Sequence, residues 1–243
     1  MAKTALIIGG TKGLGLSLAW EAQRREIWPM ITGRSVHKSA SKFPPNCGWK
    51  TLDLTNWLSV EDFFEFYNCY DYVVWNAGEL IEKPFKDFTL KELLQMTLLH
   101  YVGPIEFLRN LITWQREYEK SFHLITISST SSWRIRDNQA VYCSLQAAKS
   151  AFTSNLSREL ARDLPGSKTT LFHPGGMKTR LFKGTKTDTS NFMDTDEVAK
   201  IIWNEVENQR TPFHEVQIMR NDDGSPNVSY GPRMPESPFG EEV

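Results

Sequence analysis

The chain has 243 residues, enough for one large α/β domain with a substantial buried core. Its 28 basic and 29 acidic residues nearly cancel, to a net charge of −1, and give no support for a nucleic-acid partner or an anionic membrane surface. The longest apolar runs fall far short of the ~20 residues that cross a bilayer, and no secretory apolar region opens the chain.

The cysteine content predicts a reducing compartment and no metal site. Cys47, Cys69 and Cys143 form an odd, scattered set without the spacing of metal ligands. We therefore expect a cytoplasmic protein with free thiols and without a nucleic-acid, membrane or metal partner. An aromatic content of 12% with eight tryptophans is too high for disorder over most of the chain.

Strand-like apolar runs alternate with helical patterns along most of the sequence. The predicted strands are 4–8, 28–32, 48–52, 70–75, 122–128, 169–172 and 213–220. The predicted helices are 13–25, 57–67, 90–117, 140–164 and 195–209. This alternation predicts an α/β fold of the Rossmann type, in which a doubly wound parallel sheet of about seven strands carries helices on both faces.

The end of the chain differs in composition from the rest. We expect a single nucleotide-binding domain over residues 1–220 and a tail over residues 221–243. The tail holds four prolines and three glycines, which exclude a regular helix or a central strand. It is therefore expected either to be flexible or to lie across the surface.

A glycine-rich turn, GGTKGLG, joins the first predicted strand to the first predicted helix. Its glycines permit a tight turn and a close approach of the backbone to a pyrophosphate, whose charge then meets the helix N-terminus. We expect a dinucleotide to bind here. The residues assigned to it are Gly9, Thr11, Lys12, Gly13, Leu14 and Gly15.

The segment after the second predicted strand favours NADP(H) over NAD(H). A chain that binds NAD usually carries an acidic residue there, which holds the 2′-hydroxyl of the adenosine ribose. This chain has Arg34 and Ser35 instead, and Lys12 lies on the glycine turn. Arginine and lysine both suit the oxygens of a 2′-phosphate. The predicted cofactor is therefore NADP(H).

A serine and a tyrosine thirteen residues apart, Ser129 and Tyr142, complete a pattern that resembles the short-chain dehydrogenase/reductase family. The spacing of Gly9, Gly13 and Gly15 resembles the short, single-domain branch of that family, which disfavours a nucleotide-sugar epimerase. The resemblance extends to an acidic residue after the third strand, an Asn-Ala-Gly turn and a Pro-Gly-x-x-x-Thr turn. It assigns further cofactor contacts to Asp53, Leu54, Asn76, Ala77, Gly78, Tyr142, Gln146, Pro174, Gly175, Met177 and Thr179.

The resemblance also implies how such a site would work. In the family the tyrosine exchanges a proton with the substrate oxygen, and the serine binds the same oxygen. A lysine four residues after the tyrosine lowers the tyrosine pKa and holds the nicotinamide ribose, and an asparagine on the preceding helix completes a proton relay. Here those two positions hold Gln146 and His100. The next lysine, Lys149, lies two helical turns from Tyr142, at a rise of roughly 10 Å, and is a poor substitute by distance. The resemblance thus assigns the chemistry to Ser129, Tyr142, His100 and Gln146.

These departures affect the two directions of the reaction differently. Alcohol oxidation needs a phenolate, whereas carbonyl reduction starts from neutral tyrosine, whose ordinary pKa is about 10. The missing lysine therefore weakens oxidation more. Gln146 can still hydrogen-bond the ribose and contribute to cofactor binding. His100 is either part of a rebuilt relay or a packed helix histidine, because Phe107 and Leu111 share its face. Trp75 is a further departure, since the family has an asparagine there.

Two loops that the family geometry brings to the substrate mouth are rich in basic residues. These residues are Arg134, Arg136, Lys178, Arg180 and Lys183. Their charge either selects an anionic substrate, a carboxylate or phosphate that bears a carbonyl, or only keeps the loops soluble. Leu181 and Phe182 are expected to add an apolar wall. Cys143 points away from Tyr142 around the helix and is expected to pack rather than react.

The sequence therefore predicts an NADP(H)-dependent oxidoreductase that reduces the carbonyl of a small metabolite by hydride transfer, with Tyr142 as the proton donor. The alternative is a catalytically silent member of the same fold that binds NADP(H) and serves as a sensor or subunit partner. The expected partners are a small carbonyl or alcohol substrate and further copies of the chain, because the resemblance implies a homodimer or homotetramer.

Overall fold

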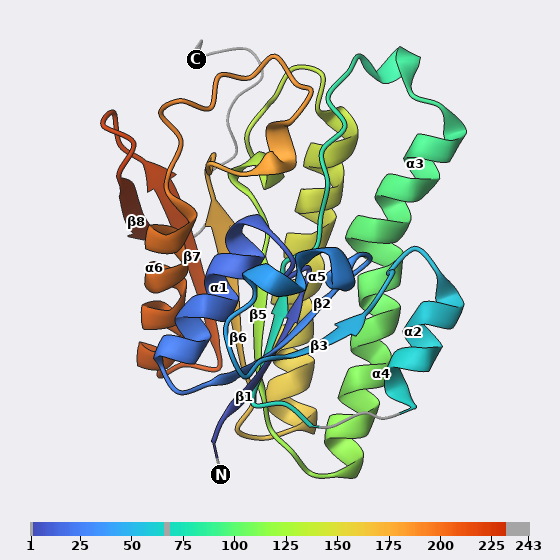
Figure 1. The fold of residues 1–243 in the computed structure, drawn as a ribbon, viewed down its shortest axis with the longest axis vertical. Coiled ribbons are helices and arrows are strands. Elements are labelled where there is room, and N and C mark those ends of the chain that lie inside the picture. The colour runs from blue at the N-terminus through green and yellow to red at the C-terminus, as the bar shows by residue number, and fades with distance from the viewer. Residues whose placement is uncertain (1, 66–68, 232–243) are drawn as a thin grey trace.

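Eight strands form one sheet in the computed structural model, which describes residues 2–65 and 69–231 (Figure 1). The strands are β1 (Thr4–Ile8), β2 (Trp28–Gly33), β3 (Gly48–Thr51), β4 (Tyr72–Trp75), β5 (His123–Ile127), β6 (Lys168–Pro174), β7 (Phe213–Arg220) and β8 (Pro226–Tyr230). Their order is β3-β2-β1-β4-β5-β6-β7-β8, and all pairs are parallel except β7 with β8. The strand order reverses between β1 and β4, which is where such sheets bind their ligands.

Helices cover both faces of this sheet. They are α1 (Gly13–Arg24), α2 (Trp57–Phe64), α3 (Leu90–Thr97), α4 (Gly103–Glu117), α5 (Ala140–Asp163) and α6 (Thr195–Asn208). A π-helical turn, Leu98–Val102, joins α3 to α4. Short 3₁₀ helices span Val36–Lys42, Phe85–Asp87, Thr130–Ser132 and Arg180–Phe182. Within the described residues, none of the helices combines the length and apolar character that crossing a bilayer requires.

Alternate residues of each central strand enter opposite cores, because successive side chains of a strand point to opposite faces. In β1, Ala5 and Ile7 pack with α1 and α6, whereas Leu6 and Ile8 pack with α2, α4 and α5. The predicted doubly wound α/β fold is therefore confirmed, with helices on both faces of the sheet (Figure 1). The predicted strands and helices recur with ends that differ by at most two residues, apart from the end predicted at residue 67, which lies outside the described residues. The exception in kind is the single helix predicted over residues 90–117, which is divided into α3 and α4 by the π-helical turn.

The C-terminal strand β8 departs from the predicted boundary at residue 220. The segment after β7 turns back through Gly224, which has a φ of +85°, and Pro226–Tyr230 pairs antiparallel with β7. A proline can open such a strand because β8 is the edge of the sheet, where one row of N–H groups needs no partner. The first part of the predicted tail therefore belongs to the sheet, and residues 232–243 lie outside the described structure.

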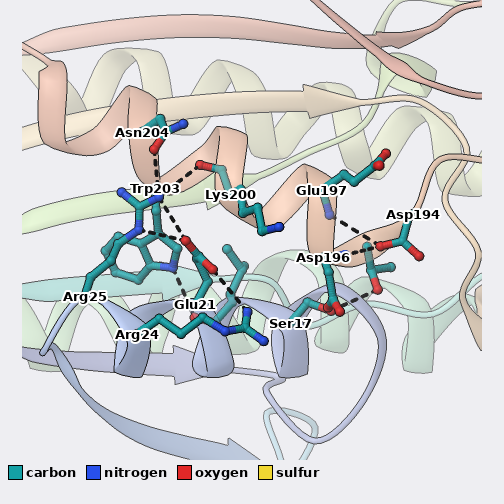
Figure 2. A network of polar contacts seen from close by, with 12 residues as sticks. Ser17, Glu21, Arg24, Arg25, Asp194, Asp196, Glu197, Lys200, Trp203 and Asn204 are labelled. Carbon is teal, nitrogen blue, oxygen red and sulfur yellow. Dashed lines mark hydrogen bonds and ion pairs between the residues drawn. The ribbon is translucent and has the colours of Figure 1, made fainter.

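Polar contacts join α1 to α6, which pack against each other on one face of the sheet (Figure 2). The Trp203 indole donates to the Leu18 carbonyl at 3.0 Å. The Arg25 guanidinium contacts the buried Glu21 carboxylate at 3.0 Å and the Asn204 side chain at 2.7 Å. Glu21 is only 6% exposed, so its carboxylate needs such partners to offset the cost of its burial.

Replacing Arg25 by alanine should lower the free energy of unfolding by about 2 kcal/mol, since Glu21 then keeps only the half-exposed Arg24 as an ionic partner. Urea unfolding followed by circular dichroism measures this. The matched control is Arg109→Ala, which removes an exposed ion pair within α4 and should change stability little. Equal losses in the two variants would contradict the role of Arg25.

Candidate active site

A cavity of about 870 Å³ opens at the carboxyl ends of the parallel strands. It brings together nearly all of the residues that the sequence assigns to a cofactor or to catalysis. Its lining includes Gly9, Thr11, Lys12, Gly13, Leu14, Arg34, Ser35, Leu54, Asn76, Ala77, Gly78, His100, Ser129, Tyr142, Gln146, Pro174, Gly175, Met177 and Thr179. Gly15 and Asp53 are not part of the lining. The Asp53 carboxylate instead binds the backbone and hydroxyl of Thr55.

The glycine turn is shaped so tightly that side chains would not fit. Gly9 has a φ of +84°, and a Cβ there would lie 2.6 Å from the Ala77 Cα. A Cβ on Gly15 would lie 2.2 Å from the Gly9 carbonyl oxygen, so Gly15 acts by letting α1 pack against the turn. Asn76 donates to the same carbonyl at 2.9 Å and ties the turn to the end of β4.

The N-terminus of α1 is open to an anion. Lys12 stands at the N-cap position, and no side chain caps the first N–H groups of the helix. Those N–H groups and the positive end of the helix dipole face a cavity rimmed by Lys12 and Arg34. The residues therefore fit the pyrophosphate of a dinucleotide, and the site has the donors that such a group needs.

Ser129 and Tyr142 both line this cavity. Ser129 follows β5, and its Oγ accepts from the Ser131 N–H at 3.1 Å, which holds the serine in place. Tyr142 lies in the first turn of α5 and is 7% exposed. Burial raises the pKa of Tyr142 to about 12, although a hydrogen bond with the Ser129 side chain acts in the opposite direction. The phenol is thus protonated at neutral pH, in the form that can donate.

His100 and Gln146 form a hydrogen-bonded pair beside Tyr142. The Gln146 amide donates to His100 Nδ1 at 3.1 Å, and His100 Nε2 lies 2.7 Å from the Glu79 carbonyl oxygen. The His100 and Tyr142 rings meet edge to face, with centroids 5.6 Å apart. Among the described residues nothing donates to Gln146 Oε1, which is buried.

His100 is 1% exposed, as the interpretation of a packed helix histidine expects. Burial, and second the positive charge of Lys149, lower the pKa of His100 to about 4. Its imidazole is therefore neutral at pH 7, and the argument from an ordinary pKa near 6.5 does not apply. The π-helical turn inserts this ring into the cavity, and such turns often occur at functional sites.

Lys149 also lines the cavity, although its distance along α5 made it a poor candidate from the sequence. It is 1% exposed, and its Nζ lies 3.4 Å from the Trp75 carbonyl oxygen and 4.5 Å from the centroid of the Trp75 ring. Burial lowers its pKa to about 7. The sequence already places Lys149 nearly on the face of Tyr142, since seven residues at about 100° each end within roughly 20° of it, and only the rise of two turns counted against it.

Basic side chains dominate the rim of the cavity. The cationic residues in its lining beyond the glycine turn are Arg34, Arg134, Arg136, Lys149, Arg180, Lys183 and Arg220. The acidic residues in the lining are Glu79 and Asp188, so the cavity carries net positive charge. Leu181 and Phe182 form part of its wall, as expected, whereas Lys178 is not in the lining. Cys143 lies outside the lining and is half-buried, and burial raises its pKa, which does not suit a nucleophile.

Comparisons with known proteins agree with this geometry. The family model of the short chain dehydrogenases matches residues 3–190, and the chain therefore belongs to that family. An uncharacterized oxidoreductase of Staphylococcus epidermidis is 23% identical over 207 residues, which cover 82% of this chain and 89% of the relative. An uncharacterized oxidoreductase of Staphylococcus aureus is 22% identical over 214 residues, with the same two coverages.

Solved structures show the same fold. A short chain dehydrogenase/reductase family protein superposes with a TM-score of 0.79 at 19% identity, over 89% of this chain and 95% of the other. An alcohol dehydrogenase from Thermococcus sibiricus, complexed with 5-hydroxy-NADP, has a TM-score of 0.74 at 20% identity, over 88% and 95%. A 3-ketoacyl-(acyl-carrier-protein) reductase from Brucella melitensis, complexed with NADH, has a TM-score of 0.78 at 16% identity, over 91% and 98%. At these identities the likeness supports the fold and leaves the cofactor preference of this chain open.

Three residues of this chain differ from those that the family resemblance implies at their positions. Trp75, His100 and Gln146 replace the residues that the resemblance implies, and Lys149 contacts or acts on two of these three. Gln146 and Lys149 project from successive turns of α5, Trp75 ends β4, and His100 comes from the π-helical turn. These residues form two contacting pairs, Trp75 with Lys149 and His100 with Gln146, and the His100 ring contacts Tyr142.

Proposed function

We propose that this protein is an NADP(H)-dependent oxidoreductase that reduces a carbonyl group of a small metabolite. One observation carries the proposal: a single cavity joins an uncapped helix N-terminus, a basic rim and the side chains of Ser129 and Tyr142. Bound NADPH supplies the hydride. Ser129 orients and polarises the carbonyl oxygen, and the Tyr142 hydroxyl gives that oxygen its proton, which yields the alcohol and leaves a phenolate.

We propose that the cofactor is held by two groups of residues in the lining of the cavity. We assign the pyrophosphate to the glycine turn and the N-terminus of α1, and the nicotinamide end to the loop from Pro174 to Thr179. Gln146 lines this space, and its Oε1, which has no partner among the described residues, accepts a hydrogen bond from a ribose hydroxyl in our proposal.

Lys12 and Arg34 are proposed to select NADP(H) by binding its 2′-phosphate. Both are exposed on the cavity rim, and Arg34 pairs with Glu79 at 3.6 Å. The double variant Lys12→Ala/Arg34→Ala should raise the Kd for NADPH about 100-fold and leave the Kd for NADH nearly unchanged, because two charge-assisted contacts to the phosphate are lost. Quenching of protein fluorescence on cofactor addition measures both constants.

The control for this prediction is Lys38→Ala. Lys38 is an exposed cation on the same connection after β2, but it does not line the cavity. It should leave both constants unchanged. If the double variant weakens NADPH and NADH equally, the two cations do not read the 2′-phosphate.

The function is tested by following NADPH absorbance with a panel of aldehydes, ketones and oxo acids, for the wild type and for Gln146→Lys. We expect turnover by the wild type on at least one carbonyl. Tight NADPH binding without wild-type turnover, together with turnover by Gln146→Lys, would support the silent binder instead. The basic rim favours substrates that carry a carboxylate or phosphate, so oxo acids should rank above uncharged ketones of the same length.

We propose a cytoplasmic homodimer or homotetramer that acts on a small-molecule carbonyl or alcohol. Size-exclusion chromatography with light scattering measures the number of subunits. A monomer at micromolar concentration would contradict that part of the proposal.

A further inference from the structure

Lys149 is a buried cation that the mechanism above leaves without a role. Its Nζ has one long contact to a backbone carbonyl and lies over the face of the Trp75 ring, and within residues 2–65 and 69–231 no carboxylate pairs with it. Burying an ammonium group without a counter-ion is costly, and a methionine of similar length would fill the space without that cost. A buried charge kept in a cavity wall points to a function.

The surroundings of Lys149 lead to Tyr142. Both residues lie on one face of α5, about 10 Å apart along its axis. The His100 ring meets the Tyr142 ring edge to face, and the Gln146 amide bonds to His100. Gln146 lies about one turn before Lys149 on α5, and the positive charge of Lys149 lowers the pKa of His100. Trp75 of β4 offers Lys149 only a carbonyl and a ring. Of the described groups around Lys149, those that titrate are therefore His100 on the π-helical turn and Tyr142 on the same helix.

Tyr142 needs a positive charge nearby when it acts as a proton donor. Its hydroxyl is buried, and the phenolate left after donation has no cation in contact with it among the described residues. We propose that Lys149 is a positioning residue for Tyr142: a buried cation that acts across the His100–Gln146 pair and stabilises the negative charge that Tyr142 acquires as it gives up its proton. The proposal rests on the proposed function, since it assumes that Tyr142 donates to a carbonyl.

The size of the effect follows from the separation. At about 10 Å, with an effective dielectric constant of about 20, one unit charge changes the pKa of the other group by about one unit. The charge of Lys149 should therefore speed proton donation by about tenfold. It acts at a distance, so it is expected to tune the rate rather than to be indispensable.

The protonation of Lys149 makes this effect depend on pH. Its pKa of about 7 means that it is charged below pH 7 and neutral above it. His100, with a pKa of about 4, is neutral across this range, and Tyr142, with a pKa of about 12, stays protonated. Carbonyl reduction should therefore be about tenfold faster at pH 6 than at pH 8.5, with the fall centred near pH 7.

Two variants separate charge from packing. Lys149→Met should remove the fall near pH 7 and give the slow rate throughout. Lys149→Arg should also remove the fall but keep the fast rate, because a guanidinium does not lose its proton. Lys168→Met, which removes a partly buried lysine bonded to the Gln209 carbonyl, should leave the pH profile unchanged. A Lys149→Met enzyme with the wild-type profile would overturn the proposal.

Measurements without cofactor keep the proposal separate from the reaction. In ¹³C-lysine NMR of the free protein, the Cε resonance missing from Lys149→Met should titrate near pH 7, while exposed lysines titrate near 10. In alkaline absorbance titration, with Tyr142→Phe as the reference, Lys149→Arg should lower the pKa of Tyr142 by about one unit. Lys149→Met should not, because Lys149 is already neutral there.

These outcomes are distinguishable from failure of the proposed function. Wild-type protein without turnover on any carbonyl contradicts that function, whereas the two titrations still decide whether Lys149 is a titrating cation coupled to Tyr142. If Lys149→Met does not fold, Lys149→Arg serves as the reference instead. The Lys149 resonance is then the one that is present in the ¹³C–¹H spectrum of the wild type and missing from that of Lys149→Arg, and its titration is followed in the wild type. A Lys149 that titrates near pH 10, or an unshifted Tyr142 in Lys149→Arg, overturns the inference.

Discussion

Tyr142→Phe should lower kcat for carbonyl reduction by 10²- to 10⁴-fold, which corresponds to a rise of about 3–5 kcal/mol in the activation barrier. The variant keeps the ring that packs against His100 and loses only the hydroxyl that donates the proton. Ser129 keeps its bond to the Ser131 N–H, so the serine loop has no reason to move. The rate is measured from the loss of NADPH absorbance at saturating carbonyl.

Cofactor binding separates a chemical effect from a structural one in this variant. The Kd for NADPH should stay within about threefold of wild type, because the glycine turn, Lys12 and Arg34 are untouched. The matched control is Tyr101→Phe, since Tyr101 packs against the same small core as Tyr142 but does not line the cavity. Equal rates in wild type and Tyr142→Phe would exclude Tyr142 as the proton donor.

The raised pKa of Tyr142 also predicts a difference between the two directions. Oxidation of an alcohol needs the phenolate. Below the pKa of about 12, the phenolate fraction rises tenfold with each unit of increasing pH. Reduction needs the neutral phenol, which is present in full up to about pH 11. The protein is therefore expected to favour reduction near neutrality, in agreement with the absence of a cation in contact with Tyr142 in the described structure.

The parts of the fold that depend on local pattern could be predicted from the sequence. The alternation of strands and helices, and the glycine turn between β1 and α1, each follow from spacing alone. Strand β8 could not be predicted in this way, because proline and glycine are compatible both with an edge strand in a hairpin and with an irregular tail on the surface. The π-helical turn was also hidden, since Leu90–Glu117 reads as one helix and the extra residue in the turn leaves no mark in composition.

The residues of the site likewise fall into two groups: those that local motifs predict and those whose position depends on tertiary packing. Motifs placed Ser129, Tyr142 and Arg34 in one cavity, because the carboxyl ends of parallel strands meet there. They did not show that His100 is bonded at both nitrogens or that Lys149 is buried, since burial depends on Trp75, from a different part of the chain. A lysine on a helix is usually a solvated residue, and only the packing of α5 against β4 reveals the exception.

The close approach of α4 to the loop after β3 predicts the largest loss of stability. Gly103 begins α4 directly after the π-helical turn, and a Cβ there would lie 1.9 Å from the Leu54 carbonyl oxygen. Moving either the helix backbone or this carbonyl costs free energy, because both belong to the main chain. Gly103→Ala should lower the free energy of unfolding by about 3 kcal/mol, net of the ~1 kcal/mol that alanine gains over glycine in a helix.

The same substitution should disturb the site, because His100 lies one turn before Gly103 and Leu54 lines the cavity. We therefore expect weaker NADPH binding as well as a lower urea midpoint in Gly103→Ala. The matched control is Gly48→Ala, whose Cβ would lie 2.6 Å from the Met30 Cε. The end of a methionine side chain moves easily, so this variant should cost less than about 1 kcal/mol. Equal losses of stability in the two variants would contradict this prediction. In that case the close contact between α4 and Leu54 would not be what positions the π-helical turn and His100 at the cavity.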